Sequence, residues 1–223
     1  MAEIAREDET LDEIRGIKII QKKKGYRFSM DSLLLAEFVN LKDVKKAMDL
    51  GTGSGIIAIL LAKRSAGLEV TGVELQDNLF DLARRNVELS FLSDRVEIIK
   101  RDIRMLKNRF EEGSFDLIVS NPPYYPAGKG RTGTNRERTM ARHEVAVTMT
   151  DIIEASSFLL MEGGRIAIIY PASRLKEAIS AMRKCRIGPG RVRKIYTREA
   201  EVVLIEGEKG YERELLEEPP LYL

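Results

Sequence analysis

The sequence has little of what cross-links a chain or binds a metal ion. Its 223 residues include one cysteine, Cys185, one histidine, His143, and no tryptophan. A single cysteine cannot form an internal disulfide, and a lone thiol is typical of a reducing compartment. The sequence also offers no constellation of the usual metal ligands. We therefore expect a fold held together by its apolar core, with no disulfide and no bound metal.

Long apolar runs are missing as well. A membrane-spanning helix needs about 18 or more consecutive apolar residues, whereas one of the longest apolar stretches here covers only residues 56–62. Residues 1–12 alternate acidic and apolar side chains and lack the basic and apolar regions of a secretory signal. The chain is nevertheless 43% hydrophobic, which is enough to bury a core. These features predict one cytoplasmic domain over residues 1–223, monomeric and without a membrane span.

The chain alternates short apolar runs with longer amphipathic stretches. The short runs predict strands at residues 47–50, 69–74, 96–99, 116–120, 164–170, 192–196 and 202–206. The stretches between them predict helices at residues 56–65, 78–91, 151–161 and 174–184. Such strand and helix units are typical of an α/β fold with a mostly parallel sheet and helices on both faces. Residues 197–201 are too few for a parallel crossover, so this seven-stranded sheet should end in one reversed, antiparallel strand.

Two segments lie outside this alternation. The N-terminal part, residues 1–45, predicts a hairpin of residues 17–20 and 26–28, followed by a helix from Asp31. Residues 125–142 have no apolar period and contain several glycines and many basic side chains. Because long loops without structure of their own are usually functional, we interpret residues 125–142 as a substrate loop.

A glycine-rich motif follows the first strand of the alternation. Asp49 is followed by Gly51, Thr52, Gly53 and Gly55, and an apolar helix is predicted directly afterwards. Glycines in such a turn let the chain bend sharply and let a ligand approach the amides at the helix N-terminus. The third glycine comes one residue earlier than in the dinucleotide fingerprint. The turn therefore favours another ligand, and the Asp49 carboxylate could bind the ammonium group of an amino-acid moiety.

Two further acids end the next strands. Glu74 lies nineteen positions after Gly55, where an acid can accept both hydroxyls of a ribose. Asp102, after the third strand, can accept the exocyclic amine of an adenine or else cap a turn. Leu75 and Ile103 follow these acids directly. An ammonium site, a ribose site and an adenine site together describe S-adenosylmethionine better than any dinucleotide.

The motif Asn121-Pro122-Pro123-Tyr124 follows the fourth strand. The side-chain oxygen of Asn121 and the carbonyl of Pro122 can accept hydrogen bonds from one planar amino group. Two such acceptors help the nitrogen to pyramidalise toward a methyl sulfonium, and Tyr124 could stack on a target base. The alternative is an ordinary turn that ends a strand.

These motifs resemble those of the class I S-adenosylmethionine-dependent amino-methyltransferases, which have a Rossmann-like fold. Within that class, the sequences at residues 26–36, 121–126, 141–144 and 219–222 are similar to those of the bacterial tRNA(Val) adenine-N6 methyltransferases. The resemblance implies a seven-stranded sheet, S-adenosylmethionine as cofactor and N6-methylation of the adenosine beside the valine anticodon.

The resemblance also assigns roles to individual residues. It implies that the segment containing Phe28, Ser29 and Asp31 closes over the methionine end of the cofactor. The cofactor-binding set, listed in full, is Phe28, Ser29, Asp31, Asp49, Gly51, Thr52, Gly53, Gly55, Glu74, Leu75, Asp102, Ile103 and Asn121. Asn121, Pro122 and Tyr124 form the expected catalytic set.

Basic residues in three parts of the chain predict contacts with RNA phosphates. They are Lys22, Lys23, Lys24, Arg131, Arg136, Arg138, Arg142, Arg191, Arg193 and Lys194. The formal net charge of only +2 does not by itself indicate a nucleic-acid partner. We favour tRNA as the partner over scattered, solvated charge.

Other functions stay open at this point. The same chemistry could serve another planar amino group, such as a protein glutamine or an adenine of ribosomal RNA or DNA. A noncatalytic RNA-binding module would keep the fold and bind the cofactor without turnover.

Overall fold

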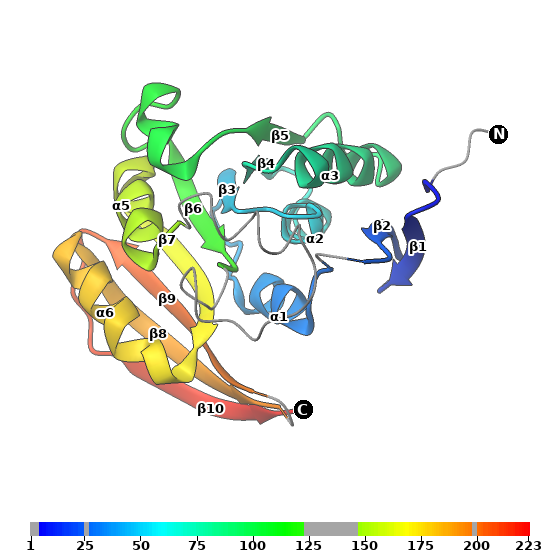
Figure 1. The fold of residues 1–223 in the computed structure, drawn as a ribbon. Coiled ribbons are helices and arrows are strands. Elements are labelled where there is room, and N and C mark those ends of the chain that lie inside the picture. Colours follow the sequence, from blue (N-terminus) through cyan, green and yellow to red (C-terminus); the bar gives the residue numbers. More distant parts are fainter. Residues whose placement is uncertain (1–4, 25–26, 123–146, 198–199) are drawn as a thin grey trace.

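The computed structural model describes residues 5–24, 27–122, 147–197 and 200–223. Its centre is an eight-stranded sheet with the strand order β10-β8-β9-β7-β6-β3-β4-β5 (Figure 1). The strands are β3 (Lys46–Leu50), β4 (Glu69–Glu74), β5 (Val96–Lys100), β6 (Phe115–Ser120), β7 (Leu160–Pro171), β8 (Ile187–Tyr196), β9 (Glu201–Lys209) and β10 (Leu216–Tyr222). Each of the seven predicted strands is present, although β7 and β8 begin several residues earlier than predicted.

The reversed strand is β9, and it lies inside the sheet. β9 pairs antiparallel with β7 on one side and with β8 on the other, so the predicted antiparallel pair is confirmed. The reversed strand β9 does not lie at the edge of the sheet, because β8 pairs on its outer side. The predicted count of seven strands was wrong, because β10 adds an eighth strand parallel to β8. Pro219 and Pro220 hid this strand in the sequence, since proline lacks an amide and is tolerated in sheets mainly at an edge.

Helices cover both faces of the sheet (Figure 1), which confirms the predicted α/β class. One face carries α1 (Met30–Phe38), α2 (Ile56–Arg64) and α3 (Asp77–Leu89). The other carries η1 (Ile103–Asn108), α5 (Met149–Leu159), η2 (Ala172–Arg174) and α6 (Leu175–Lys184). Within the described ranges, no helix is long and apolar enough to cross a membrane.

The alternation of side chains along β7 divides the core between these two faces. Ala167 and Ile169 pack in the core under α1 and α2, whereas Ile166 and Ile168 pack in the core under α5 and α6. This follows from strand geometry, because successive side chains point to opposite faces of a sheet. A strand buried on both faces reads as a continuous apolar run, which is why β7 was predictable.

The N-terminal hairpin differs from the prediction. It consists of β1 (Glu9–Ile14) and β2 (Ile17–Lys22), which pair antiparallel around Arg15 and Gly16, two residues with positive φ. The expected second strand at residues 26–28 was wrong: residue 26 lies outside the described residues, and residues 27 and 28 form no strand. The hairpin therefore forms earlier in the chain, and a short connection leads from it to α1.

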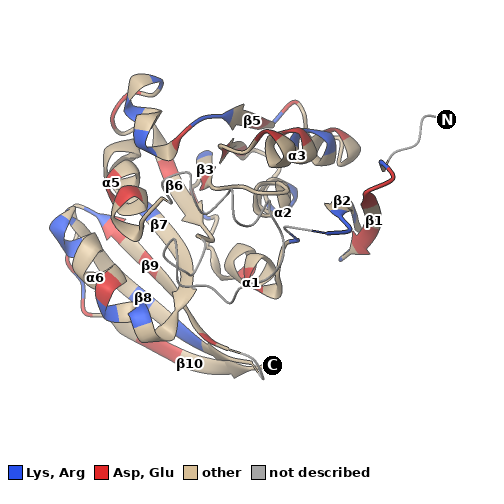
Figure 2. Cartoon of the chain, in the orientation of Figure 1, with Lys and Arg blue, Asp and Glu red and all other residues tan. Residues whose placement is uncertain are grey.

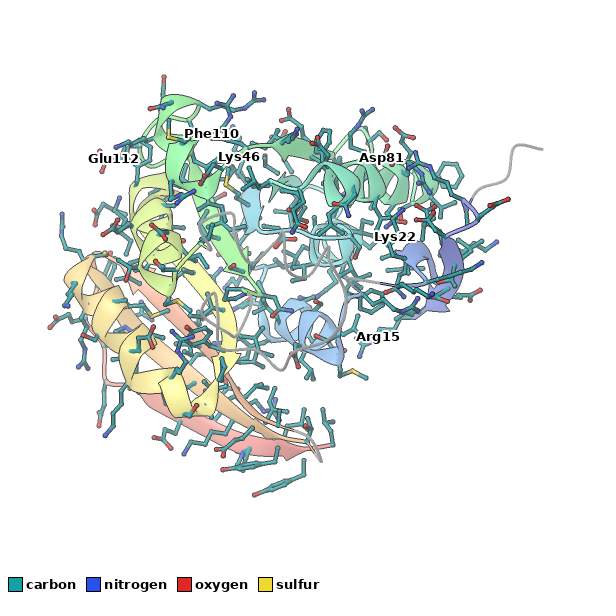
Figure 3. The ribbon with its side chains drawn as sticks, viewed as in Figure 1. Arg15, Lys22, Lys46, Asp81, Phe110 and Glu112 are labelled. Carbon is teal, nitrogen blue, oxygen red and sulfur yellow. The ribbon has the colours of Figure 1, made fainter. Side chains whose placement is uncertain are left out.

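The hairpin docks on α3 through a buried ion pair. Glu9 is only 3% exposed, and its carboxylate accepts a hydrogen bond of 2.9 Å from Arg85 on α3. Lys22 pairs with the same carboxylate at 3.0 Å. Figure 2 shows acidic β1 beside basic β2, and Figure 3 marks Lys22 on the hairpin and Asp81 on the neighbouring α3. Charged side chains of the hairpin, including Lys22, which was predicted to contact RNA, thus attach the hairpin to the main body.

Candidate active site

The glycine-rich turn lies between β3 and α2, at the carboxyl edge of the sheet. The amides of Gly51 and Thr52 both donate to the carbonyl oxygen of Val73 on the neighbouring strand β4, each at 2.9 Å. Gly55, which precedes α2, has φ +83°, and a Cβ built there would lie 3.4 Å from Cα of Ala83. The turn is therefore fixed against β4 and packed beside α3, and the positive φ of Gly55 disfavours any residue with a side chain.

Asp49 lies at the start of this turn and is fully buried. Its Oδ2 accepts a hydrogen bond of 2.6 Å from the Thr52 hydroxyl, whereas its Oδ1 has no hydrogen-bond partner among the described residues. Burial raises the pKa of the Asp49 carboxyl to about 7, against the opposing effects of Thr52 and the Ala58 amide, and the Glu74 carboxylate raises it as well. A buried carboxylate oxygen without a partner fits the ammonium group expected at this position.

Glu74 ends β4 beside the turn and is 6% exposed. Its carboxylate accepts hydrogen bonds from the amides of Gly53 at 3.0 Å and of Leu75 and Gln76 at 2.9 Å. Burial raises the pKa of Glu74, and these amides partly oppose the rise. Leu75, the next residue, is 39% exposed. The structure thus joins Glu74 to the glycine turn through Gly53, as the predicted ribose site requires.

Asp102 has well-defined partners of its own. It caps η1, where its Oδ1 accepts a hydrogen bond of 2.9 Å from the Arg104 amide, and its carboxylate also pairs with the Arg104 guanidinium. The side-chain hydrogen bond from Arg104 lowers the pKa of Asp102 despite its partial burial. Ile103 is buried next to it. Asp102 therefore acts as a helix cap in this structure, and its contact with an adenine stays a prediction.

Asn121 follows β6, at the same edge of the sheet. Its Nδ2 donates to Oγ of Ser32 on α1 over 3.1 Å. The preceding residue, Ser120, is buried and donates from its hydroxyl to the Leu50 carbonyl at 2.8 Å, which ties the end of β6 to the end of β3. Pro122 is buried after Asn121. Asn121 and the glycine turn are thus held at neighbouring strand ends.

The start of α1 brings the third part of the predicted site to the same place. Phe28 is half-buried and packs on the core below α1 and α2, Ser29 is the exposed cap residue, and Asp31 lies half-buried in the first turn. Ser32, the next residue, contacts Asn121. The segment expected to close over the methionine end of a cofactor therefore lies beside the predicted catalytic motif.

Some predicted site residues lie outside the described residues. They are Tyr124, Arg131, Arg136, Arg138 and Arg142, and with them the whole substrate loop at residues 125–142.

Comparison with known proteins identifies the family of the chain. Residues 26–185, more than two thirds of the chain, match the family described as the methyltransferase small domain. The chain belongs to this methyltransferase family. The match begins near the start of α1 and includes the glycine turn, Glu74 and Asn121.

Curated relatives narrow the family further. The methyltransferase is 30% identical over 178 residues to the tRNA1(Val) (adenine(37)-N6)-methyltransferase of Tolumonas auensis, covering 76% of this chain and 73% of the relative. A protein of the same name from Trichodesmium erythraeum is 36% identical over 162 residues, 70% of this chain and 65% of the relative. A third, from Porphyromonas gingivalis, is 40% identical over 132 residues, 58% and 51% of the two chains. The resemblance predicted from the motifs is confirmed.

Solved structures support the fold. A predicted O-methyltransferase from Agrobacterium tumefaciens superposes with a TM-score of 0.69 at 24% identity, covering 86% of this chain and 87% of the other. Geranyl diphosphate C-methyltransferase from Streptomyces coelicolor, solved with S-adenosyl-L-homocysteine, superposes with a TM-score of 0.58 at 17% identity over 79% of each chain. At these identities the likeness shows the Rossmann-like methyltransferase fold alone.

Those of the predicted RNA-binding residues that the structure describes do not gather at this site. Lys22 pairs with Asp8 and Glu9, and Lys23 donates to the backbone carbonyl of Glu7, just before β1. Lys24 is exposed just beyond β2. This group lies on the hairpin beside α3, whereas the second group lies on β8 at the other side of the sheet (Figure 2).

The basic residues of β8 are largely engaged within the methyltransferase itself. Arg191 pairs with Glu206 and Glu218 at 2.9 Å, and its guanidinium lies 3.9 Å from the centre of the Phe38 ring. Arg193 donates to the backbone carbonyl of Pro219 on β10, and Lys194 is partly buried on β8. Arg191 and Arg193 therefore connect β8 to its neighbours.

Asn86 is a site-supporting residue that the sequence interpretation missed. It is fully buried on α3, exchanges two hydrogen bonds with the backbone of Ile20 on β2, and donates to the Ser54 carbonyl of the glycine turn at 2.9 Å. The signal was present, because Asn86 falls on the apolar stripe formed by Leu82, Ala83 and other buried residues of α3. A polar residue on such a stripe must find partners in the core.

The described part of the chain holds no group of three or more residues that could bind a metal ion. Cys185 is partly buried after α6, and burial raises the pKa of its thiol.

Proposed function

We propose that this methyltransferase transfers the methyl group of S-adenosylmethionine to the N6 amino group of an adenosine in tRNA. The observation that carries the proposal is the placement of Asn121 and buried Pro122 at the end of β6, beside the glycine turn of β3. The choice of tRNA rests on the names of the relatives, which specify adenine 37 of tRNA1(Val). We accordingly propose the adenosine beside the valine anticodon as the target.

The residues at the turn fit S-adenosylmethionine. Oδ1 of Asp49 is buried without a partner among the described residues, which suits an ammonium group. The Glu74 carboxylate next to it suits the ribose hydroxyls, and its three amide bonds hold it in place. Gly53 and Gly55 keep the approach to α2 free of side chains.

The proposed mechanism depends mainly on positioning. When bound, S-adenosylmethionine supplies a methyl group on a positively charged sulfur, which an amine lone pair can displace. Oδ1 of Asn121 and the Pro122 carbonyl accept hydrogen bonds from the two amino hydrogens, which favours a tetrahedral nitrogen with an available lone pair. Holding reacting atoms at near-attack distance can lower the barrier by several kcal/mol, on the order of 7 or more in favourable cases. The product proton can leave to solvent, so no general base is required.

We propose that fewer residues contact the RNA than the sequence alone predicted. We infer that Tyr124 stacks on the target base, which must leave its own stack first, and that residues 125–142 contact the phosphates. Arg191, whose charge is already paired with Glu206 and Glu218, takes no part, and neither does Arg193, which donates to the Pro219 carbonyl. We further propose that residues 1–223 form one domain that acts in the cytoplasm as a monomer.

Transfer of labelled methyl groups tests this function. The methyltransferase is incubated with radiolabelled S-adenosylmethionine and total tRNA from a strain that lacks the gene, and the tRNA is digested to nucleosides. Label in N6-methyladenosine is expected. Label that appears only in ribosomal RNA, DNA or a protein glutamine would show that the acceptor is not tRNA. Cofactor binding without turnover on any acceptor would indicate a noncatalytic binding module.

A further inference from the structure

The orientation of the Asn121 amide decides what it offers to an amino group. Its Oδ1 is an acceptor and its Nδ2 is a donor, and a half-turn of the terminal amide exchanges the two. An amine has hydrogens to donate, so only Oδ1 can serve it. This requirement follows from the proposed function, on which the inference rests.

Ser32 is placed to set this orientation. Its Oγ accepts a hydrogen bond of 3.1 Å from Nδ2 of Asn121, although the two residues are 89 positions apart in the sequence. Ser32 is 1% exposed, so the bond does not compete with bulk water.

The backbone around Ser32 is rigid. Ser32 lies in the first turn of α1, and its amide donates to the Ser29 carbonyl at 3.1 Å. The next four residues of α1, from Leu33 to Ala36, are all buried in the core. The Ser32 hydroxyl is therefore a fixed point against which the Asn121 side chain rests.

We propose that Ser32 is a positioning residue, which holds Nδ2 of Asn121 away from the acceptor and thereby presents Oδ1 to the amino group. Ser32 itself touches neither the amine nor the methyl group. Because Ser32 directly follows the Phe28–Asp31 segment, the same helix start serves both the predicted cofactor segment and the catalytic amide.

Kinetics of Ser32→Ala test the proposal. The variant should lower kcat on the methylated RNA about 10- to 100-fold, as small misplacements at a reacting centre do. The Kd for S-adenosylmethionine should change less than about twofold, because Asp49 and Glu74 are untouched. Ser32→Thr, which keeps a hydroxyl, should recover much of kcat. On an Asn121→Ala background, Ser32→Ala should have no additional effect, because its partner is gone.

Ser156→Ala is the matched control. Ser156 is equally buried in a helix, but its hydroxyl donates to the Ile152 carbonyl on α5, away from Asn121. Both alanine variants should lower the thermal midpoint by similar amounts, and only Ser32→Ala should lower kcat. A Ser32→Ala enzyme with wild-type kcat would overturn the proposal. So would a loss of kcat on adding Ser32→Ala to Asn121→Ala that equals its loss in the wild type.

A readout without catalysis separates this inference from the proposed function. In ¹⁵N-labelled protein, the Asn121 side-chain NH2 signals, assigned by their loss in Asn121→Ala, should exchange slowly with solvent. They should exchange faster in Ser32→Ala and stay slow in Ser156→Ala. Fast exchange in the wild type would refute the orientation even if tRNA is methylated. Slow exchange that Ser32→Ala accelerates would support it even if tRNA is not the acceptor.

Discussion

The amide of Gly53 donates a hydrogen bond of 3.0 Å to Oε2 of Glu74, which joins the glycine turn after β3 to the acid at the end of β4. The proposed site places the glycine turn at the amino-acid end of the cofactor and Glu74 at its ribose. Their bond means that the ends of two neighbouring strands are already in register before any ligand binds. Preorganisation of this kind reduces the ordering cost of binding.

Asp49→Asn should stabilise the cofactor-free protein. A carboxyl whose pKa is raised in the folded state binds more protons there than in the unfolded chain, so its contribution to stability falls as pH rises toward about 7. At roughly 1.36 kcal/mol per pKa unit, the advantage of Asp49→Asn should be about 2 kcal/mol larger near pH ~8 than near pH ~5.5. Chemical unfolding at both pH values measures it. An advantage that does not change with pH would show that Asp49 is already ionised at low pH.

The same titration should affect cofactor binding in the wild type. A protonated Asp49 cannot attract an ammonium group, so affinity for S-adenosylmethionine should fall as pH drops below about 7. Calorimetric titration across this range, with Asp49→Asn as the pH-independent and weakly binding control, provides the comparison.

Asn86→Ala should loosen the hairpin and the glycine turn together. The change leaves the Ile20 amide, the Ile20 carbonyl and the Ser54 carbonyl without their partner, which should cost about 3 kcal/mol of unfolding free energy. Asn40→Ala, at an exposed site where the side chain accepts one hydrogen bond from the Lys42 amide, should cost less than about 1 kcal/mol. Hydrogen exchange at the Ile20 amide should accelerate only in Asn86→Ala. Equal protection of this amide in both variants would contradict the proposed role of Asn86 in holding β2 to the glycine turn.

Gly55→Ala should damage the turn through its backbone. At φ +83° an alanine is strained by about 1 to 2 kcal/mol, whereas its Cβ would lie in ordinary contact with Ala83 at 3.4 Å. Gly67→Ala is the matched control, since nothing lies within 4 Å of a Cβ there, and it should be neutral or slightly stabilising. Thermal midpoints and cofactor affinity of both variants test the difference. Similar losses in the two would show that the turn tolerates a side chain.

Arg191→Ala should unfold the protein more easily without changing its RNA binding. The change removes the partner of Glu206 and Glu218 and the cation above the Phe38 ring, at a cost of about 2 to 4 kcal/mol. The salt dependence of tRNA affinity should stay the same, whereas deletion of residues 125–142 should reduce its slope. A reduced salt dependence of tRNA affinity in Arg191→Ala would show that β8 does contact RNA.

The sequence predicted the parts of the fold whose signals are local. The strands of the parallel sheet are buried on both faces and read as apolar runs, and the glycine turn and Asn121 follow two of them directly. These strands could be predicted because their burial leaves a run of apolar residues in the sequence. The same reasoning could place Glu74 and Asn121 at one edge, because the carboxyl ends of parallel strands share it.

The parts that were missed depend on partners far apart in the sequence. β1 was hidden because its one buried residue is the charged Glu9, and its partners Lys22 and Arg85 lie 13 and 76 positions later in the sequence. β10 was hidden by its prolines and glutamates, which an edge strand tolerates. Arg191 reads as a free cation until Glu206 and Glu218 are brought beside it. The partners of such ion pairs lie in distant segments, so the sequence of one segment does not show whether its charged residues are paired.

The most direct test of the central claim is single-turnover methyl transfer to purified valine tRNA by the wild type and by Asn121→Ala, with the Kd for S-adenosylmethionine measured for both. We predict N6-methyladenosine from the wild type, a rate lower by at least about 100-fold in Asn121→Ala, and nearly equal cofactor affinity. An Asn121→Ala enzyme that methylates the adenosine at the wild-type rate would contradict the account.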